Sequence, residues 1–296
     1  MEEYSEKTVR SRYRKNKIFR SIVIGLSILT VIPIVLIIGQ VFINGISQIN
    51  LSFFTKTAPD SFQAMAAAAS NETIPGGIAN GITGTLIIII IASLISIPAG
   101  LMTGIYLAEN KNSRYSDLIR NITEILQGIP SIVLGIISYL WIVKNITDGF
   151  SAFAGSVALA IMMLPLIIRS TEETIKMVPG EIREAAYALG TPYYRIILQV
   201  LIPTGFSGIS TGILLSLSRI IGETAPLMMT ALGSSTINFN ITKPVSAVPL
   251  LIWDFYNDPN MVRMVWSSSL FLMFLVLSLN IASRTLSSGR KNSKKR

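Results

Sequence analysis

Two charged residues, Arg219 and Glu223, lie inside an apolar stretch of the sequence. They fall between residues 205 and 232, a run of apolar and small residues long enough to cross a membrane as one helix. Each charge costs roughly 2.5 to 3.5 kcal/mol at the centre of a membrane helix, whereas a Leu or Ile returns only about 0.3 to 0.6 kcal/mol. The span is therefore stable only if both side chains face protein or water.

The spacing of this pair indicates which chemistry it could perform. Four residues apart on a helix, Arg219 and Glu223 are placed to form an ion pair, and the remaining guanidinium donors stay available to an anion. Small and polar residues at intervals of three or four share the same helical face, namely Gly205, Gly208, Gly212, Ser216, Pro226 and Thr230. This face is either one wall of an oxyanion pathway or a structural ion pair beside glycines that allow close helix packing.

The composition requires a membrane. Of the 296 residues 50% are hydrophobic and 14% charged, with a mean hydropathy of +0.57, whereas soluble domains carry about 25% charged residues. We expect an all-α, multi-pass protein of the cell membrane, with a membrane domain at 21–285 and polar tails at 1–20 and 286–296. Its six predicted spans are residues 22–43, 82–107, 129–143, 152–168, 205–232 and 264–282.

The positive charge is unevenly distributed. A net charge of +9 would suggest nucleic acid as the partner of a soluble protein, but these charges lie in tails and loops without interleaved aromatic residues, so anionic lipids are the expected neighbours. The tails and loops of one side hold 20 of the 25 Lys and Arg, and those of the other side hold Lys56, Lys144, Lys243 and Arg263. Because basic residues stay cytoplasmic, both termini are predicted in the cytoplasm.

Two residue types are absent. With Cys 0 and His 0, the chain has no disulfide, thiolate or imidazole metal site, cysteine nucleophile or histidine base. No paired carboxylates lie within a predicted span either, so we predict neither a catalytic nor a metal site. The outer segment 44–80 contains an Ala-rich patch and is interpreted as an external loop with a short interfacial helix.

The cytoplasmic segment 178–203 has the local signals of a helical hairpin. Gly190 suits the left-handed position after a first short helix. Thr191 is predicted to cap the second helix, and Pro192 to lie in its first turn, where no amide donor is needed.

This hairpin resembles a signature of the permeases of ABC importers: Glu-Ala-Ala, three residues, Gly, nine residues, then Ile-x-Leu-Pro. The chain has Glu184-Ala185-Ala186, Gly190 and Val200-Leu201-Ile202-Pro203, with Val and Ile as conservative departures. The resemblance implies a type I permease bundle of six helices and an ATPase contact formed by Glu184, Ala185, Ala186 and Gly190. The chain has no G-x-x-x-x-G-K-[ST] motif, so ATP and Mg²⁺ are expected on a separate ATPase dimer.

The segment from Arg219 to Leu227 resembles the Arg-x-x-Gly-Glu-Thr segment of phosphate-specific permeases in that family, and so do residues 76–78 and 80–85. This resemblance implies that Arg219, Glu223 and Thr224 serve phosphate passage, with Ser216 on the same predicted face. It also implies a sister permease and a phosphate-binding receptor. Two alternatives stay open: a permease for another oxyanion, or an ion-coupled carrier that uses Glu223 as a relay. The hairpin argues against the carrier, which has no ATPase to dock.

Overall fold

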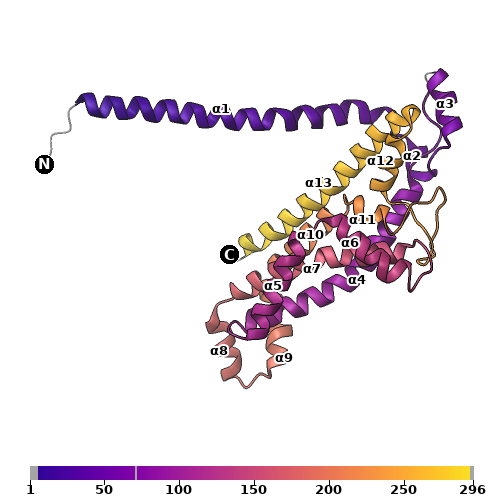
Figure 1. The fold of residues 1–296 in the computed structure, drawn as a ribbon. Coiled ribbons are helices and arrows are strands. Elements are labelled where there is room, and N and C mark those ends of the chain that lie inside the picture. Colours follow the sequence, from indigo (N-terminus) through magenta and orange to yellow (C-terminus); the bar gives the residue numbers. More distant parts are fainter. Residues whose placement is uncertain (1–5, 71, 294–296) are drawn as a thin grey trace.

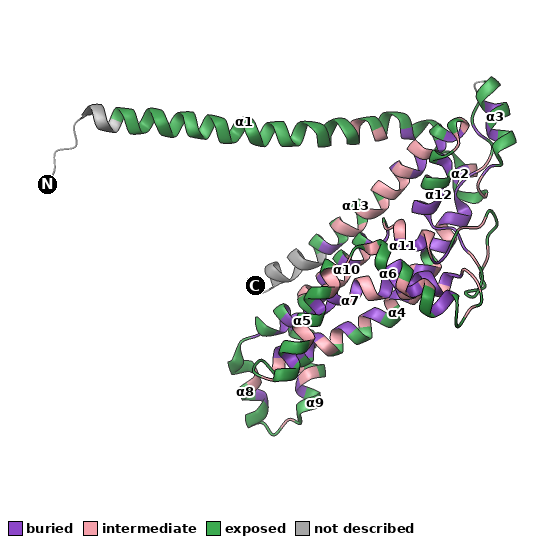
Figure 2. Cartoon of the chain, in the orientation of Figure 1, coloured by how far each residue is buried: buried purple, intermediate pink, exposed green. Residues whose placement is uncertain are grey.

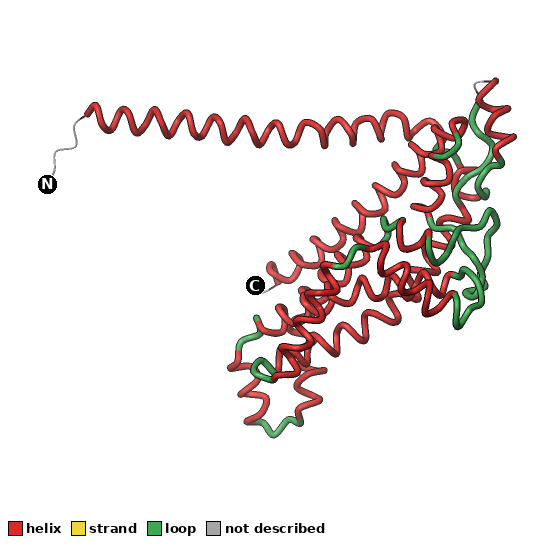
Figure 3. Tube along the Cα trace, in the orientation of Figure 1, coloured by secondary structure: helices red, strands yellow, loops and turns green. Residues whose placement is uncertain are grey.

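The computed structural model describes residues 6–70 and 72–293 and is almost entirely helical (Figures 1 and 3). Within these residues the only β-type contact is an isolated bridge between Leu232 and Val245. The predicted all-α class is confirmed.

Five helical segments are long and apolar enough to cross a membrane, and a bent pair of shorter helices makes a sixth span if it is counted as one. The long helices are α1 (Glu6–Gly45), α4 (Ala79–Glu109), α7 (Ala152–Lys176), α10 (Ile202–Ile220) and α13 (Val262–Ser293). The short helix α9 (Tyr193–Arg195) and a π-helical stretch, η3 (Ile196–Leu201), lead directly into α10.

The third predicted span, 129–143, corresponds to the second half of a bent pair of helices. Helix α5 (Arg114–Gly128) meets α6 (Ser131–Ser138) and its π-helical extension η2 (Tyr139–Val143) at an angle of 104°. The bend falls at Pro130, which has no amide donor and disfavours helical geometry in the residue before it. If the pair is counted as one span, that span begins at Arg114 and not at residue 129.

The predicted tails are not separate from the helices. Helix α1 already begins at Glu6, and α13 continues to Ser293, so most of both basic segments extends a membrane helix. Polar residues such as Arg and Lys are good helix formers, which allows a span to run on beyond its apolar part. Residues 1–5 and 294–296 of the tails lie outside the described residues.

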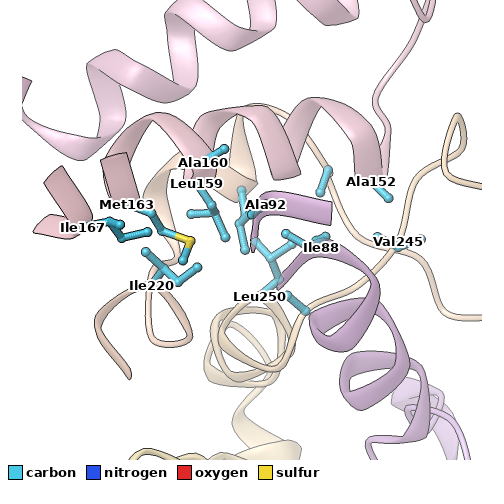
Figure 4. Packing of buried hydrophobic residues seen from close by; sticks show 13 residues of the cluster. Ile88, Ala92, Ala152, Leu159, Ala160, Met163, Ile167, Ile220, Val245 and Leu250 are labelled. Atoms are coloured by element: carbon cyan, nitrogen blue, oxygen red, sulfur yellow. The ribbon is translucent and has the colours of Figure 1, made fainter. Parts of the chain in front are cut away.

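The core lies where α4, α7 and α10 meet. Ile88 and Ala92 of α4 pack against Leu159 and Met163 of α7, and Ile220 of α10 closes the cluster (Figure 4). All of these side chains are at most 1% exposed. The three helices thus form the rigid centre of the molecule.

The outer segment 44–80 is structured. It contains η1 (Ile46–Gln48), α2 (Leu51–Thr55) and α3 (Ser61–Ser70), followed by the start of α4. The Ala-rich patch forms α3, which confirms a short helix there. Phe53 and Ala64 are fully buried in a second cluster with α12 (Val248–Tyr256), η4 (Pro259–Met261) and α13. The segment is therefore a packed cap rather than a loose loop.

The two ends of the bundle differ in character. Helices α8 (Gly180–Ala188) and α9 project from one end, whereas α3 and α12 lie at the other (Figure 1). Helix α1 contacts the rest of the chain near Gly45 and extends away from the bundle, and it is exposed along nearly its whole length (Figure 2).

A candidate anion site and a coupling hairpin

The helix of the fifth span runs from Tyr193 to Ile220 and ends next to Arg219. Helix α10 ends at Ile220, and the chain turns at residues 221–224 before the short helix α11 (Ala225–Met228). Pro226 explains the break, because its ring would clash with the carbonyl of Gly222 in a continuous helix and it has no amide to donate. The predicted span 205–232 therefore lies too far along the chain, since the helix that is long enough to cross a membrane is Tyr193–Ile220 and it does not continue to residue 232.

The break separates the two predicted partners. Arg219 is exposed in the last turn of α10, and Glu223 is half-buried in the turn. Among the described residues, neither side chain forms an ion pair, with the other or elsewhere. The expected i,i+4 pair is not formed, because that register exists only while the helix continues.

The back of the break is packed and its front is open. Ile220 and Ile221 are buried, and Ile220 lies against Ile88 and Leu159, inside the spans α4 and α7. On the other side Gly222 is exposed, and a Cβ added there would meet no atom within 4 Å. Arg219 thus lies next to a residue packed inside the bundle, beside an open stretch of non-helical backbone.

The turn contains both bonded and unbonded backbone amides. The amides of Ile221 and Glu223 donate to the carbonyls of Leu217 and Ile220, both at 3.1 Å. Within the described part of the chain, the amides of Gly222 and Thr224 donate to no backbone carbonyl or side chain. Thr224, which is half-buried, makes no side-chain hydrogen bond at the start of α11. The break therefore presents a guanidinium, two free amides and a hydroxyl.

The small-residue stripe of α10 serves helix packing. A Cβ on Gly205 or Gly208 would crowd Thr174 of α7, and one on Gly212 would overlap Ser170. Ser216 is 0% exposed, and its hydroxyl donates to the Ile213 carbonyl of its own helix at 2.7 Å. The packing explanation of the glycines is confirmed. Ser216 is buried, so it does not lie at the surface with Arg219.

The hairpin closes as its Gly predicts. Gly190 has φ +69°, in the left-handed region, and the amide of Thr191 donates to the Ala186 carbonyl at 3.2 Å, which completes a Schellman-type helix end. The predicted capping role of Thr191 is wrong. Its amide is used to close α8, and Pro192, with no side-chain hydrogen bond, is the residue that precedes α9.

The signature residues divide between two faces of α8. Glu184, Ala185 and Gly190 are exposed. Ala186 is buried against an apolar cluster that includes Ile105 of α4, Ile175 of α7 and Ile196. Around the exposed residues, Leu189 is 84% and Tyr187 52% exposed, so this end carries apolar side chains with no cover in the single chain. Ala186 thus packs α8 against the bundle, while Glu184, Ala185 and Gly190 are exposed.

Charged side chains that the sequence pattern does not single out hold the hairpin end together. Arg183 of α8 lies 2.9 Å from Glu109 of α4, and Arg120 of α5 donates to Glu172 of α7 at 2.9 Å. Glu109 directly follows an apolar run and Glu172 lies four residues beyond one, which is a weak signal in the sequence. The partners are separated by many residues, so no local periodicity pairs them.

The sequence profile described as binding-protein-dependent transport system inner membrane component matches residues 97–291, which run from α4 through α13. The chain belongs to this family. Its members include close relatives of this protein. The phosphate transport system permease protein PstA of Yersinia pestis is 36% identical over 284 residues, covering 95% of this chain and 92% of the relative. The protein of the same name from Xylella fastidiosa is 39% identical over 246 residues, covering 82% of each.

A solved structure shares the fold. The inward-facing MetNI methionine ABC transporter contains a chain that superposes with a TM-score of 0.60 at 20% identity, over 71% of this chain and 94% of that one. The bundle of this family member is therefore that of an ABC importer permease, and it lies in the membrane as a multi-pass protein.

Proposed function

We propose that this chain is a permease subunit of an ATP-driven importer of inorganic phosphate. It works with a sister permease of the PstC type, an ATPase dimer that binds ATP and Mg²⁺, and a phosphate-binding receptor. The relatives named PstA support the cargo, since this chain covers most of their length. The observation that carries the proposal is the exposed guanidinium of Arg219, which forms no ion pair with any described residue and lies beside an open helix break.

An arginine at this depth has few acceptable surroundings. A charged side chain inside a span faces protein or a water-filled cavity rather than lipid, and non-helical backbone at membrane depth is tolerated only in the same places. The face that carries Arg219 and Gly222 is exposed in the single chain. A sister permease that closes over this face would turn it into the wall of an aqueous passage.

The donors at the break suit a tetrahedral oxyanion. A guanidinium offers a planar fork of N–H groups, and the free amides of Gly222 and Thr224 add neutral donors beside it. Phosphate carries up to two negative charges, which need a cation in a medium of low dielectric constant. In this proposal Glu223, half-buried in the same turn, limits how tightly the anion is held, so that it is released on the cytoplasmic side.

The exposed hairpin provides the ATPase contact of the proposal. Glu184, Ala185 and Gly190 lie at its surface, next to uncovered apolar side chains such as Leu189. Its place on the cytoplasmic side follows from the distribution of basic residues.

Uptake by purified components tests the function. The chain, its sister permease and the ATPase are reconstituted in liposomes loaded with Mg-ATP, with receptor and labelled phosphate outside. Phosphate should accumulate only with ATP and receptor present, and excess sulfate or molybdate should not compete. Accumulation of sulfate in its place would favour the oxyanion alternative, and uptake driven by a proton gradient without ATP would favour the carrier.

A further inference from the structure

Two arginines join the same two helix ends in a reciprocal arrangement. Arg120 of α5 donates through Nε to Oε1 of Glu172 on α7, at 2.9 Å, and through Nη2 to the Leu107 carbonyl of α4, at 3.0 Å. Arg183 of α8 places Nη1 2.9 Å from Oε1 of Glu109 on α4 and donates through Nη2 to the Ile175 carbonyl of α7, also at 2.9 Å. Each arginine thus contacts a carboxylate of one helix and a main-chain carbonyl of the other.

The position of these carbonyls gives the arrangement a physical basis. Leu107 and Ile175 lie in the last turns of α4 and α7, where carbonyl groups lack the amide partners of a helix interior, and the Ile175 carbonyl also accepts from the amide of Val178 at 3.2 Å. The ends of both helices also carry partial negative charge, which favours a cation. Arg120 and Arg183 therefore satisfy two helix ends while tying them together.

Helices α4 and α7 form one rigid unit at this end. A Cβ on Gly100 would come within 2.7 Å of Ile167, and one on Gly104 within 2.6 Å of Thr171. The backbones approach as closely as these side chains allow, so sliding of one helix along the other is opposed by direct overlap.

The contacts of Arg120 and those of Arg183 differ in how many hydrogen bonds support them. Arg120 has further acceptors in Asp117 and the Lys111 carbonyl, and Glu172 also accepts from Lys176. The contact of Arg183 with Glu109 lacks hydrogen-bond geometry, and the buried Nε of Arg183 has no partner. The pair is largely shielded from solvent, with side chains 20% and 14% exposed. Charge attraction in partly buried surroundings holds it, rather than a fixed hydrogen-bond network.

Among the described residues, Arg183 provides the polar contacts between α8 and the α4–α7 unit. Apart from it, α8 is anchored by Ala186 in the apolar cluster and by its chain connections at 177–179 and 189–192. Short connections and one small apolar contact leave the helix free to pivot. An ion pair that also engages the end of α7 opposes that pivot.

We propose that Arg183 and Glu109 are positioning residues that pass the movement of α8 to the α4–α7 unit. The inference rests on the proposed function, in which an ATPase moves α8. With the pair intact, displacement of α8 carries the core helices with it. Without the pair, α8 pivots on its connections, so ATP is hydrolysed while the transmembrane helices follow poorly.

The transport test measures phosphate uptake and ATP hydrolysis in the same vesicles. Arg183→Gln and Glu109→Gln should lower the phosphate moved per ATP by roughly fivefold or more, the lower range of coupling between protein sites. Arg183→Lys, which keeps the charge, should recover part of the ratio. The matched control is Arg169→Gln, which breaks an exposed pair with Glu173 on α7 and should leave the ratio unchanged. An unchanged ratio in assembled Arg183→Gln and Glu109→Gln complexes would overturn the inference.

A second readout does not depend on the cargo. Spin labels at Glu181→Cys on α8 and Met102→Cys on α4 report the distance between the two elements, and both native side chains are exposed. We expect a narrow distance distribution with and without nucleotide in the parent, and a broadened one in Arg183→Gln and Glu109→Gln. Equal widths would overturn the positioning role even if phosphate proved not to be the cargo. Loss of ATP-driven phosphate uptake by the parent would instead overturn the proposed function alone.

Discussion

A cation on an apolar helix must be met by protein, water or an anion, and Arg219 is met by no carboxylate in the described structure. The turn after it frees two amides and leaves Gly222 in open space. At the scale of single residues, the candidate site is therefore a guanidinium and two amides for which the described residues provide no acceptor.

Removal of this charge should abolish transport without disturbing the fold. Arg219→Gln keeps polarity and much of the side-chain volume but removes the charge and the fork, so phosphate uptake should collapse while the complex assembles. Arg219→Lys, with charge but no planar fork, should keep only part of the activity. Vesicle uptake normalised to assembled complex measures both. Full uptake by Arg219→Gln would end the pathway role.

Glu223 should act on release rather than on recruitment. If its carboxylate weakens the hold on the anion, Glu223→Gln should slow turnover while the concentration of phosphate at half-maximal uptake stays equal or falls. Uptake measured over a range of phosphate concentrations separates the two parameters. A large rise in that concentration would instead assign Glu223 to binding.

Gly190 tests the hairpin through its backbone alone. A Cβ at Gly190 or at Gly180 would meet nothing within 4 Å, but only Gly190 has φ +69°. Gly190→Ala should therefore cost about 1 kcal/mol in the hairpin and lower permease-stimulated ATP hydrolysis, whereas the matched control Gly180→Ala should not. Equal hydrolysis by the two variants would show that the left-handed turn is not required for coupling.

At the scale of elements, the small residues of α10 determine how closely it approaches α7. Gly205, Gly208 and Gly212 face Thr174 and Ser170 across the contact. Such contacts replace hydrophobic driving force in a membrane, where lipid is as apolar as the helices. This packing holds α10 against α7 up to the turn that follows Ile220.

Gly212→Ala should weaken this contact. The added methyl overlaps Ser170, and overpacking of this kind costs about 1 to 3 kcal/mol, so the melting temperature of the solubilised complex should fall. Gly39→Ala on α1 is the control, because a Cβ there meets nothing within 4 Å. Equal melting temperatures would mean that α7 and α10 separate readily enough to accept the methyl.

At the scale of the molecule, the ends of the bundle have different tasks. Helices α8 and α9 carry the exposed hairpin at one end, and α2, α3 and α12 form a packed cap at the other (Figures 1 and 2). Helix α1 leaves the bundle with apolar residues exposed from Ile22 to Ile43, so it requires lipid or a second membrane subunit as cover.

The distribution of basic residues predicts which end faces the cytoplasm. The chain has no native thiol, so single engineered cysteines report sidedness without background. A membrane-impermeant thiol reagent should label Ser235→Cys, in the loop before α12, on intact cells, and should reach Ser293→Cys only after the membrane is opened. External labelling of Ser293→Cys would refute the topology.

The sequence by itself determined the properties that depend on composition and local pattern. Apolar length predicted the long helices α1, α4, α7 and α13, Gly190 predicted the left-handed end of α8, and the charge at Arg219 marked the stretch where the predicted fifth span departs from the structure. These signals lie within one continuous segment of the chain, because solvation and backbone preference act residue by residue.

Only the tertiary structure decided what each of these features contacts. The same glycine stripe is compatible with a pathway wall or a packed interface, and the neighbour α7 makes it an interface. The pairing of Arg183 with Glu109 joins positions that are distant in sequence, and the break after Ile220 leaves Arg219 without the partner that helical periodicity assigned to it. Periodicity specifies a face of a helix, but the chemistry of that face depends on what packs against it.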